Sequence, residues 1–69
     1  MKKYFYYVVY EVRTDDLTII GSVEMETNRP ITHGEDLVWI AKDIKRKHEL
    51  PRTPTITNFL LLRTEEVPA

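Results

Sequence analysis

The chain of 69 residues is 42% hydrophobic and 30% charged, and its formal net charge is −1. This length predicts one domain over residues 1–69, and the nearly balanced charge gives no field that would draw the whole molecule to nucleic acid or to an anionic membrane. The lack of cysteine in the sequence excludes disulfides, thiolate nucleophiles and cysteine-bound zinc. A core this small is marginal, and a partner subunit or a binding partner is the usual remaining source of stability.

No segment of the sequence resembles a membrane span or a leader. The apolar runs fall well short of the roughly 20 residues that a membrane helix needs. The run that follows Met1-Lys2-Lys3 is rich in tyrosine and lacks the small-residue cleavage site of a signal peptide. We therefore expect a cytoplasmic protein with no membrane contact.

The first predicted element is a strand over residues 3–13. Its centre, residues 4–12, reads YFYYVVYEV, and aromatic and β-branched residues fit a pleated surface but lose rotamer freedom in a helix. Unlike the other predicted strands, it is apolar on both faces for most of its length. Such a strand is central and covered on both sides, or covered on one side and open to a partner on the other.

A second strand is predicted over residues 17–27, where apolar and polar residues alternate. One face carries Leu17, Ile19, Gly21, Val23 and Met25, the other carries Thr18, Ser22, Glu24 and Glu26, and Ile20 breaks the pattern. A two-residue turn at Asp15-Asp16 would set Tyr10 opposite Gly21, where the missing side chain leaves space for the ring. A loop with one extra residue is the alternative. The two-residue turn also pairs apolar residues of both strands: Val12 with Ile19, Val8 with Val23, and Tyr6 with Met25.

A helix is predicted over residues 33–49. Thr32 and Glu35 have the spacing of a capping box, and the first turn is acidic and the last turn basic, as the helix dipole favours. Pro51 and Pro54 end the helix. One apolar stripe at helical spacing is expected to face the sheet, and it consists of Leu37, Ile40, Ala41 and Ile44.

A third strand is predicted over residues 55–63, followed by a frayed tail over residues 64–69. The larger apolar set is expected to point inward, namely Ile56, Leu60 and Leu62, with Asn58 on the same face and Phe59 and Leu61 on the other. A buried Asn58 would need hydrogen-bond partners. The alternative is a β-bulge that turns Asn58 outward.

Together these elements predict an α+β fold of the order β-β-α-β, in which one helix packs on one face of a three-stranded antiparallel sheet. Because the first strand is apolar on both faces, we expect it at the centre, in the strand order 2-1-3. The order 1-2-3 would make the second and third strands parallel neighbours and leave the first strand at an edge.

Four short motifs follow one another along the chain: Tyr-x-Val-x-Tyr at residues 6–10, Gly21, Pro-Ile-Thr before a Glu-Asp-Leu helix start at residues 30–37, and Ile-Thr-Asn-Phe-Leu-Leu at residues 56–61. In this layout the chain resembles small uncharacterised proteins encoded by bacteriophages and prophages. The resemblance implies a small cytoplasmic accessory protein that binds and modulates a host factor, such as a defence nuclease. It carries over no catalytic or ligand residue.

No group of residues predicts catalysis or metal binding. His33 and His48 lie at opposite ends of the predicted helix, about 22 Å apart at 1.5 Å per residue, so they cannot share a metal ion. Glu24 and Glu26 share a strand face, but carboxylates on an edge strand more often keep the sheet soluble. We expect no catalytic residue, no metal site and no cofactor.

The basic end of the helix suggests a nucleic-acid-binding alternative. Five basic residues lie between Lys42 and Arg52, against two acidic residues. The face of the sheet opposite the helix is expected to carry glutamates, which would repel phosphate, so a solvated helix end is the favoured interpretation and nucleic acid is not the expected partner.

Trp39, with Lys42 and Arg46, forms a secondary candidate surface. Helical spacing places Trp39 on the polar side of the helix, away from the apolar stripe. Its ring can lie beneath the stems of Lys42 and Arg46 with a cation–π contribution, which is the favoured interpretation. The alternative is an exposed anchor for a protein partner.

The main functional hypothesis concerns the face of the sheet that the helix leaves open. One helix cannot cover both faces, so an apolar patch rimmed by glutamates is expected there, as is typical of association surfaces. We predict a non-catalytic protein-interaction module that forms a homodimer sheet on sheet or binds another protein. The interface residues are expected to be Phe5, Tyr7, Val9, Ile20, Phe59 and Leu61.

Overall fold

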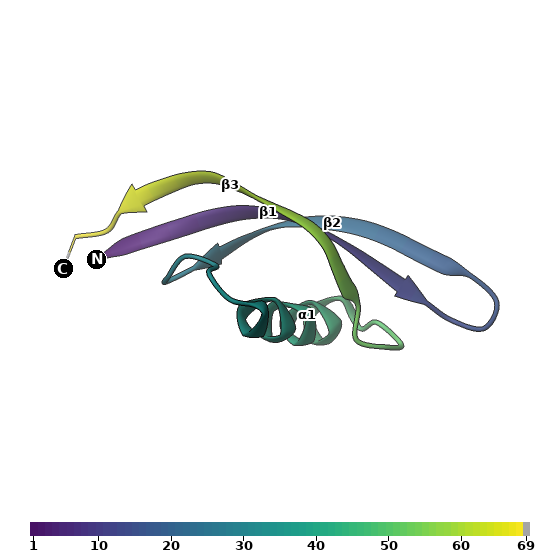
Figure 1. The fold of residues 1–69 in the computed structure, drawn as a ribbon. Coiled ribbons are helices and arrows are strands. Elements are labelled where there is room, and N and C mark those ends of the chain that lie inside the picture. Colours follow the sequence, from purple (N-terminus) through teal and green to yellow (C-terminus); the bar gives the residue numbers. More distant parts are fainter. Residues whose placement is uncertain (69) are drawn as a thin grey trace.

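The computed structural model describes residues 1–68 and contains three strands and one helix. All three strands pair antiparallel in one sheet of the order β2-β1-β3, and α1 lies against one face of it (Figure 1). The predicted α+β fold and the central place of the first strand are confirmed. In chain order the elements are β1 (Lys2–Arg13), β2 (Thr18–Thr27), α1 (Gly34–His48) and β3 (Thr55–Glu66).

The predicted ends of β1, β2 and α1 agree with the structure to within one residue, but the predicted end of β3 does not. β3 continues from residue 63 to Glu66, because its last residues pair with the start of β1, ending at the Lys2–Glu66 pair. Beyond it, the Val67 amide donates to the Met1 carbonyl at 2.8 Å. The first half of the predicted tail, residues 64–66, is therefore strand, and its last residue, Ala69, lies outside the described residues.

The register of β1 and β2 follows the sequence pattern. Tyr10 lies opposite Gly21, and a Cβ atom added to Gly21 would lie 2.5 Å from the Tyr10 ring, so the ring occupies the space that glycine leaves. The Thr14 amide donates to the Leu17 carbonyl at 2.9 Å, which closes a two-residue turn. The other predicted pairs are also present: Val12 with Ile19, Val8 with Val23, and Tyr6 with Met25.

The core lies between α1 and the even-numbered residues of β1. From Tyr6 to Val12 each of these even-numbered side chains is 7% exposed or less, and all lie on one face because side chains alternate along a strand. The opposing helix stripe supplies Ile40, Ala41 and Ile44, while Leu37 is only half-buried. The core residues of β1 are Tyr6, Val8, Tyr10 and Val12.

β3 contains two irregularities that change which way its side chains point. Its pairing with β1 shifts twice, so that Thr57 and Leu62 are extra residues that the pairing skips. Each shift of one residue reverses the facing of the residues that follow. Since directly opposed residues share a face, the helix side carries Ile56, Phe59, Leu61 and Thr64, and the other side carries Asn58, Leu60 and Arg63.

The predicted facing of the third strand is thus wrong beyond Ile56. Phe59 and Leu61 point to the helix side, where the Phe59 ring meets the edge of the Tyr6 ring at a centroid distance of 6.2 Å. Leu60, predicted to point inward, lies on the open side. Asn58 is turned outward by the bulge, as the alternative proposed.

The helix is shorter than the sheet that it covers. Its 15 residues span about 22 Å, whereas 12 residues of strand span about 40 Å. Figure 1 shows the paired ends of β1 and β3 extending past α1 on one side and the β1–β2 turn extending past it on the other. Large parts of the sheet therefore remain uncovered, and β3 has the most exposed side chains of the three strands.

Candidate interaction surface

The face of the sheet opposite α1, here called the open face, carries four of the six predicted interface residues. Phe5, Tyr7 and Val9 alternate with the core residues of β1, and Ile20 lies opposite Glu11 on the same face. Tyr7 and Ile20 are exposed, Ile20 by 73%. Whether these residues form an interface stays a prediction.

Polar contacts make this open-face patch smaller than predicted. The guanidinium carbon of Arg63 lies 4.1 Å from the centre of the Phe5 ring, and the same guanidinium pairs with Glu24 at 2.9 Å. The Tyr7 hydroxyl donates to the Ser22 hydroxyl at 2.7 Å. Arg63 thus covers Phe5 with charge, and a partner would have to displace it.

The more continuous apolar surface lies on β3. Four consecutive residues, here called the β3 apolar run, are each between 39% and 61% exposed: Phe59, Leu60, Leu61 and Leu62. Because consecutive residues of a strand alternate in direction, the run exposes apolar side chains on both faces of the sheet. β3 is also an edge strand, so the backbone groups on its outer side pair with no strand of residues 1–68.

α1 does not cover the β3 side of the sheet face on which it packs. Asp43 lines a groove with β2 residues such as Val23, so this flank of α1 faces β2. Val38 lies on the opposite flank, since the two residues are about 110° to either side of the buried stripe at 100° per residue. Val38 is exposed on this flank of α1, which faces away from β2, and Phe59 and Leu61 are exposed on the same side of the sheet as α1.

Sequence reasoning found the exposed residues of β1 and β2 but missed the β3 apolar run as a unit. It divided these residues between two faces by simple alternation, and so treated half of them as core. The available signal was the run itself, because four successive apolar residues leave a strand no polar face.

The secondary candidate, Trp39, is exposed on the polar side of α1, as helical spacing predicts. It borders a groove of about 290 Å³ between α1 and residues 27–31, which are the last residue of β2 and the segment that follows it. The expected cation–π contact is not formed within residues 1–68, because Arg46 instead pairs with Asp43 at 2.6 Å.

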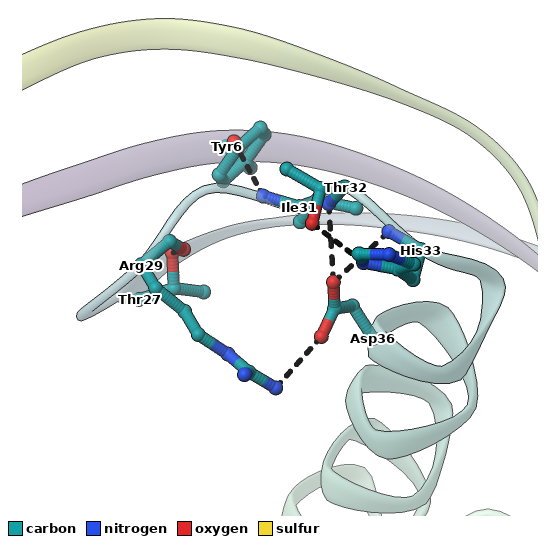
Figure 2. A network of polar contacts seen from close by, with 7 residues as sticks. All are labelled: Tyr6, Thr27, Arg29, Ile31, Thr32, His33 and Asp36. Carbon is teal, nitrogen blue, oxygen red and sulfur yellow. Dashed lines mark hydrogen bonds and ion pairs between the residues drawn. The ribbon is translucent and has the colours of Figure 1, made fainter.

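A polar network fixes the start of α1 beside this groove (Figure 2). The Asp36 carboxylate accepts hydrogen bonds from the backbone amides of Thr32 at 3.0 Å and His33 at 3.1 Å, and pairs with Arg29 at 2.8 Å. The backbone hydrogen bonds and then the Arg29 charge hold the pKa of Asp36 below its usual value. The Ile31 amide donates to the Tyr6 hydroxyl at 2.9 Å, which ties this segment to β1.

The predicted helix cap is therefore displaced by one residue. The N-cap is His33, and the acid that reaches back is Asp36 rather than Glu35. The Thr32 hydroxyl lies 2.8 Å from Nδ1 of His33 instead of capping the helix. These contacts explain Thr32 and Asp36 as residues that stabilise the fold at the start of α1.

The basic end of the helix is partly neutralised. Asp43 pairs with Arg46 and, at 3.1 Å, with Lys47, and Arg52 lies 3.8 Å from Asp15. Partial burial raises the pKa of Asp43, but hydrogen bonds from Lys47 and Arg46 outweigh this and leave the pKa below its usual value. This charge pairing weakens the case for a phosphate-binding surface.

Within residues 1–68, no three acidic or histidine side chains lie close enough together to hold a metal ion. The same part of the chain contains no helix with the length and apolar character needed to cross a membrane. Comparison with known protein families, with curated proteins and with solved structures finds no match. Function is therefore inferred from the chemistry of the surface.

Proposed function

We propose that the chain is a small non-catalytic protein-interaction module whose main contact surface is β3. The observation that carries this proposal is the exposure of the β3 apolar run, residues 59–62, on a strand with one unpaired edge. An exposed, long and apolar edge strand is a template for pairing with another chain, and natural proteins usually protect such edges. Its exposure here is best explained by a partner that covers it.

The expected mode of binding is addition of a strand to the β3 edge. Backbone hydrogen bonds would supply affinity, and side chains on both faces would supply specificity. On the helix side, Phe59 and Leu61 would meet apolar groups of the partner beside Val38. On the open face, Leu60 would do the same, close to the exposed Tyr7.

A binding role fits the polar residues better than a catalytic role. The carboxylate of Asp36 is engaged by two backbone amides and by Arg29, and therefore serves the helix start. The resemblance to phage-encoded proteins favours a cytoplasmic protein of the host as a target of the module. We propose this target class by analogy only.

The proposal is tested by capture from a host-cell lysate, with quantitative mass spectrometry, on three immobilised proteins: wild type, Leu60→Glu and Ile20→Glu. Both substituted residues are exposed and lie on the open face, but only Leu60 is in β3. A protein retained by the wild type and Ile20→Glu but lost from Leu60→Glu supports binding through β3. A lysate protein that all three retain equally would overturn it.

A salt titration of binding to mixed oligonucleotides checks the nucleic-acid alternative. Phosphate contacts weaken steeply with salt, whereas an apolar strand interface does not. The proposal predicts no oligonucleotide binding at physiological salt. Binding that weakens steeply with salt and is lost in Lys42→Ala would favour the alternative.

A further inference from the structure

We propose that β3 binds the β3 strand of a second copy of this chain, antiparallel and about a two-fold axis through Leu60. The result would be a continuous six-stranded sheet with both helices on one face. This inference rests on the proposed function, because it names the partner of the same surface. It differs from the sheet-on-sheet dimer expected from the sequence.

The two β3 bulges lie on either side of Leu60, at nearly equal distances from it. Each skipped residue forms a pair with the residue after it, residues 57–58 and residues 62–63. These two pairs lie equally far from Leu60, on either side of it. In a symmetric antiparallel pairing, residues equally distant from Leu60 face each other. Thr57 of one copy then opposes Arg63 of the other and Leu62 opposes Asn58, so each skipped residue lies opposite the neighbour of a skipped residue.

This register also matches the faces of the remaining residues. Phe59 meets Leu61 of the second copy, and Ile56 meets Thr64, and all four lie on the helix side in both copies. Leu60 meets itself on the open face. A slip of one residue would set Phe59 against Leu60, which point to opposite faces, whereas the matched register keeps each face continuous.

The charges at the ends of β3 suit the same register. The acidic end, Glu65 and Glu66, lies opposite Thr55 and Pro54 of the second copy, just after Arg52 in that chain. No like charges oppose each other along the paired strands. The exposed Arg52 can instead approach the acidic end of the other copy, which favours antiparallel association.

The paired strands would also cover the open space beside α1. Directly opposed residues share a face in an antiparallel sheet, so both helices lie on the same side and their Val38 flanks face each other across the new strand pair. Phe59 and Leu61 of both copies would lie between these flanks. The residues that are exposed in one copy would become the core of the dimer.

The available area is close to what a stable dimer needs. The molecule measures 47 × 19 × 18 Å, and 12 strand residues span about 40 Å at roughly 3.3 Å each. The β3 side is therefore a strip on the order of 700 Å². Standard stable interfaces bury roughly 800 Å² per partner.

Cysteine cross-linking tests the register, because the sequence contains no cysteine and one introduced thiol is unique. Directly opposed residues have Cα atoms about 4.5–5.5 Å apart, within the roughly 4.4–6.8 Å that a disulfide spans. Leu60→Cys should therefore form a covalent dimer rapidly under mild oxidation. Leu62→Cys should not, because its two copies lie about 13 Å apart along the strands.

Two further samples keep the test decisive. A mixture of Asn58→Cys and Leu62→Cys should give a heterodimer, since these residues oppose each other, and this covers the case in which Leu60→Cys fails to fold. Ile20→Cys is the control on the open face, and its cross-linking in preference to Leu60→Cys would favour a sheet-on-sheet dimer and overturn the proposal.

A lack of cross-linking in Leu60→Cys and in the mixture, with circular dichroism like that of the wild type, would also overturn the proposed dimer. The proposed function would still stand if a lysate protein were lost from Leu60→Glu but kept by Ile20→Glu. If neither the cross-link nor that loss were observed, both proposals would fail.

Discussion

β1 and β3 are strands of the same length with similar apolar runs, yet they occupy opposite positions in the sheet and differ in burial. β1 is central, and its residues Tyr6 to Glu11 are paired on both sides and covered by α1 on one face. β3 is at an edge, and its apolar run is exposed on both faces. A strand that is apolar on both faces is normally covered on both faces. Within one copy of the chain, β1 meets this expectation on the helix side only, and the β3 apolar run meets it on neither face.

The other edge of the sheet shows that the exposure of β3 is not a general property of the edges. β2 presents Glu24 and Glu26 on its open face, where they pair with Arg63 and Lys3. Charged side chains of this kind discourage pairing with other chains. One edge is therefore protected and the other is open, which gives the molecule a single direction for strand addition.

The largest expected difference comes from matched truncations in the two strands. Val8 is fully buried, so Val8→Ala should cost about 2–3 kcal/mol through lost apolar burial and the cavity left behind. Leu60→Ala should change the unfolding free energy of the isolated copy by less than about 0.5 kcal/mol. Urea unfolding at low protein concentration measures both. Equal losses would mean that β3 belongs to the core.

A second prediction concerns the register that places β2 on the protected edge. Gly21→Val should cost roughly 1–3 kcal/mol, because its Cβ would overlap the buried Tyr10 ring. Thr18→Val is the matched control, since Thr18 is exposed at the end of the same strand, and it should be nearly neutral. Thermal melts that ranked the two variants in the reverse order would contradict the register.

The third prediction concerns the network that holds α1 over β1. Asp36→Ala should lower Tm at pH 7, because the carboxylate accepts two backbone hydrogen bonds at the helix start. Thr32→Ala is the control and should have a smaller effect, since the Thr32 amide remains. The reverse order would mean that the helix is capped by Thr32, as its spacing to Glu35 predicted.

The same residue predicts a pH dependence. The pKa of Asp36 is lowered in the folded state, so its contribution is complete above the ordinary carboxyl pKa of about 4 and is lost as the pH falls through the lowered folded value. The Tm difference between wild type and Asp36→Ala should therefore be constant near neutral pH and shrink in acid. A difference that grew in acid would contradict the assigned contacts.

The smallest expected effect on stability is at the connection between α1 and β3. Glu49 ends α1 with φ 53° and ψ 44°, a left-handed conformation that favours glycine. Glu49→Gly should stabilise the fold by about 0.5 kcal/mol, the balance of relieved strain and added flexibility of the unfolded chain. Glu49→Ala should give no gain in the same urea unfolding measurement.

The contrast between β1 and β3 also explains how far the sequence predicts this fold. The β1–β2 register follows from local rules, because alternation and the Tyr10–Gly21 match both favour the same pairing. The facing of β3 does not follow from alternation, since the extra residues Thr57 and Leu62 each interrupt it. Nothing in a single strand sequence marks which residue its neighbour will skip.

The candidate site was predictable to the same degree. Phe5, Tyr7 and Val9 lie on the open face because β1 alternates regularly. Whether Arg63 would cover Phe5 depends on the bulge at Leu62, which sets the face of Arg63. At the start of α1, two capping-box spacings overlap, namely Thr32 with Glu35 and His33 with Asp36. The Asp36 carboxylate is preferred because it also reaches the Thr32 amide.

Sedimentation velocity on the wild type, Leu60→Glu and Ile20→Glu decides whether the chain dimerises through β3. The wild type, with a monomer mass of 8.2 kDa, is expected to sediment as a dimer, and so is Ile20→Glu. Leu60→Glu should dimerise about 100-fold more weakly, because two carboxylates would oppose each other on the two-fold axis. A wild type that stays monomeric at high concentration, or a Leu60→Glu variant that dimerises as tightly as the wild type, would contradict dimerisation through β3.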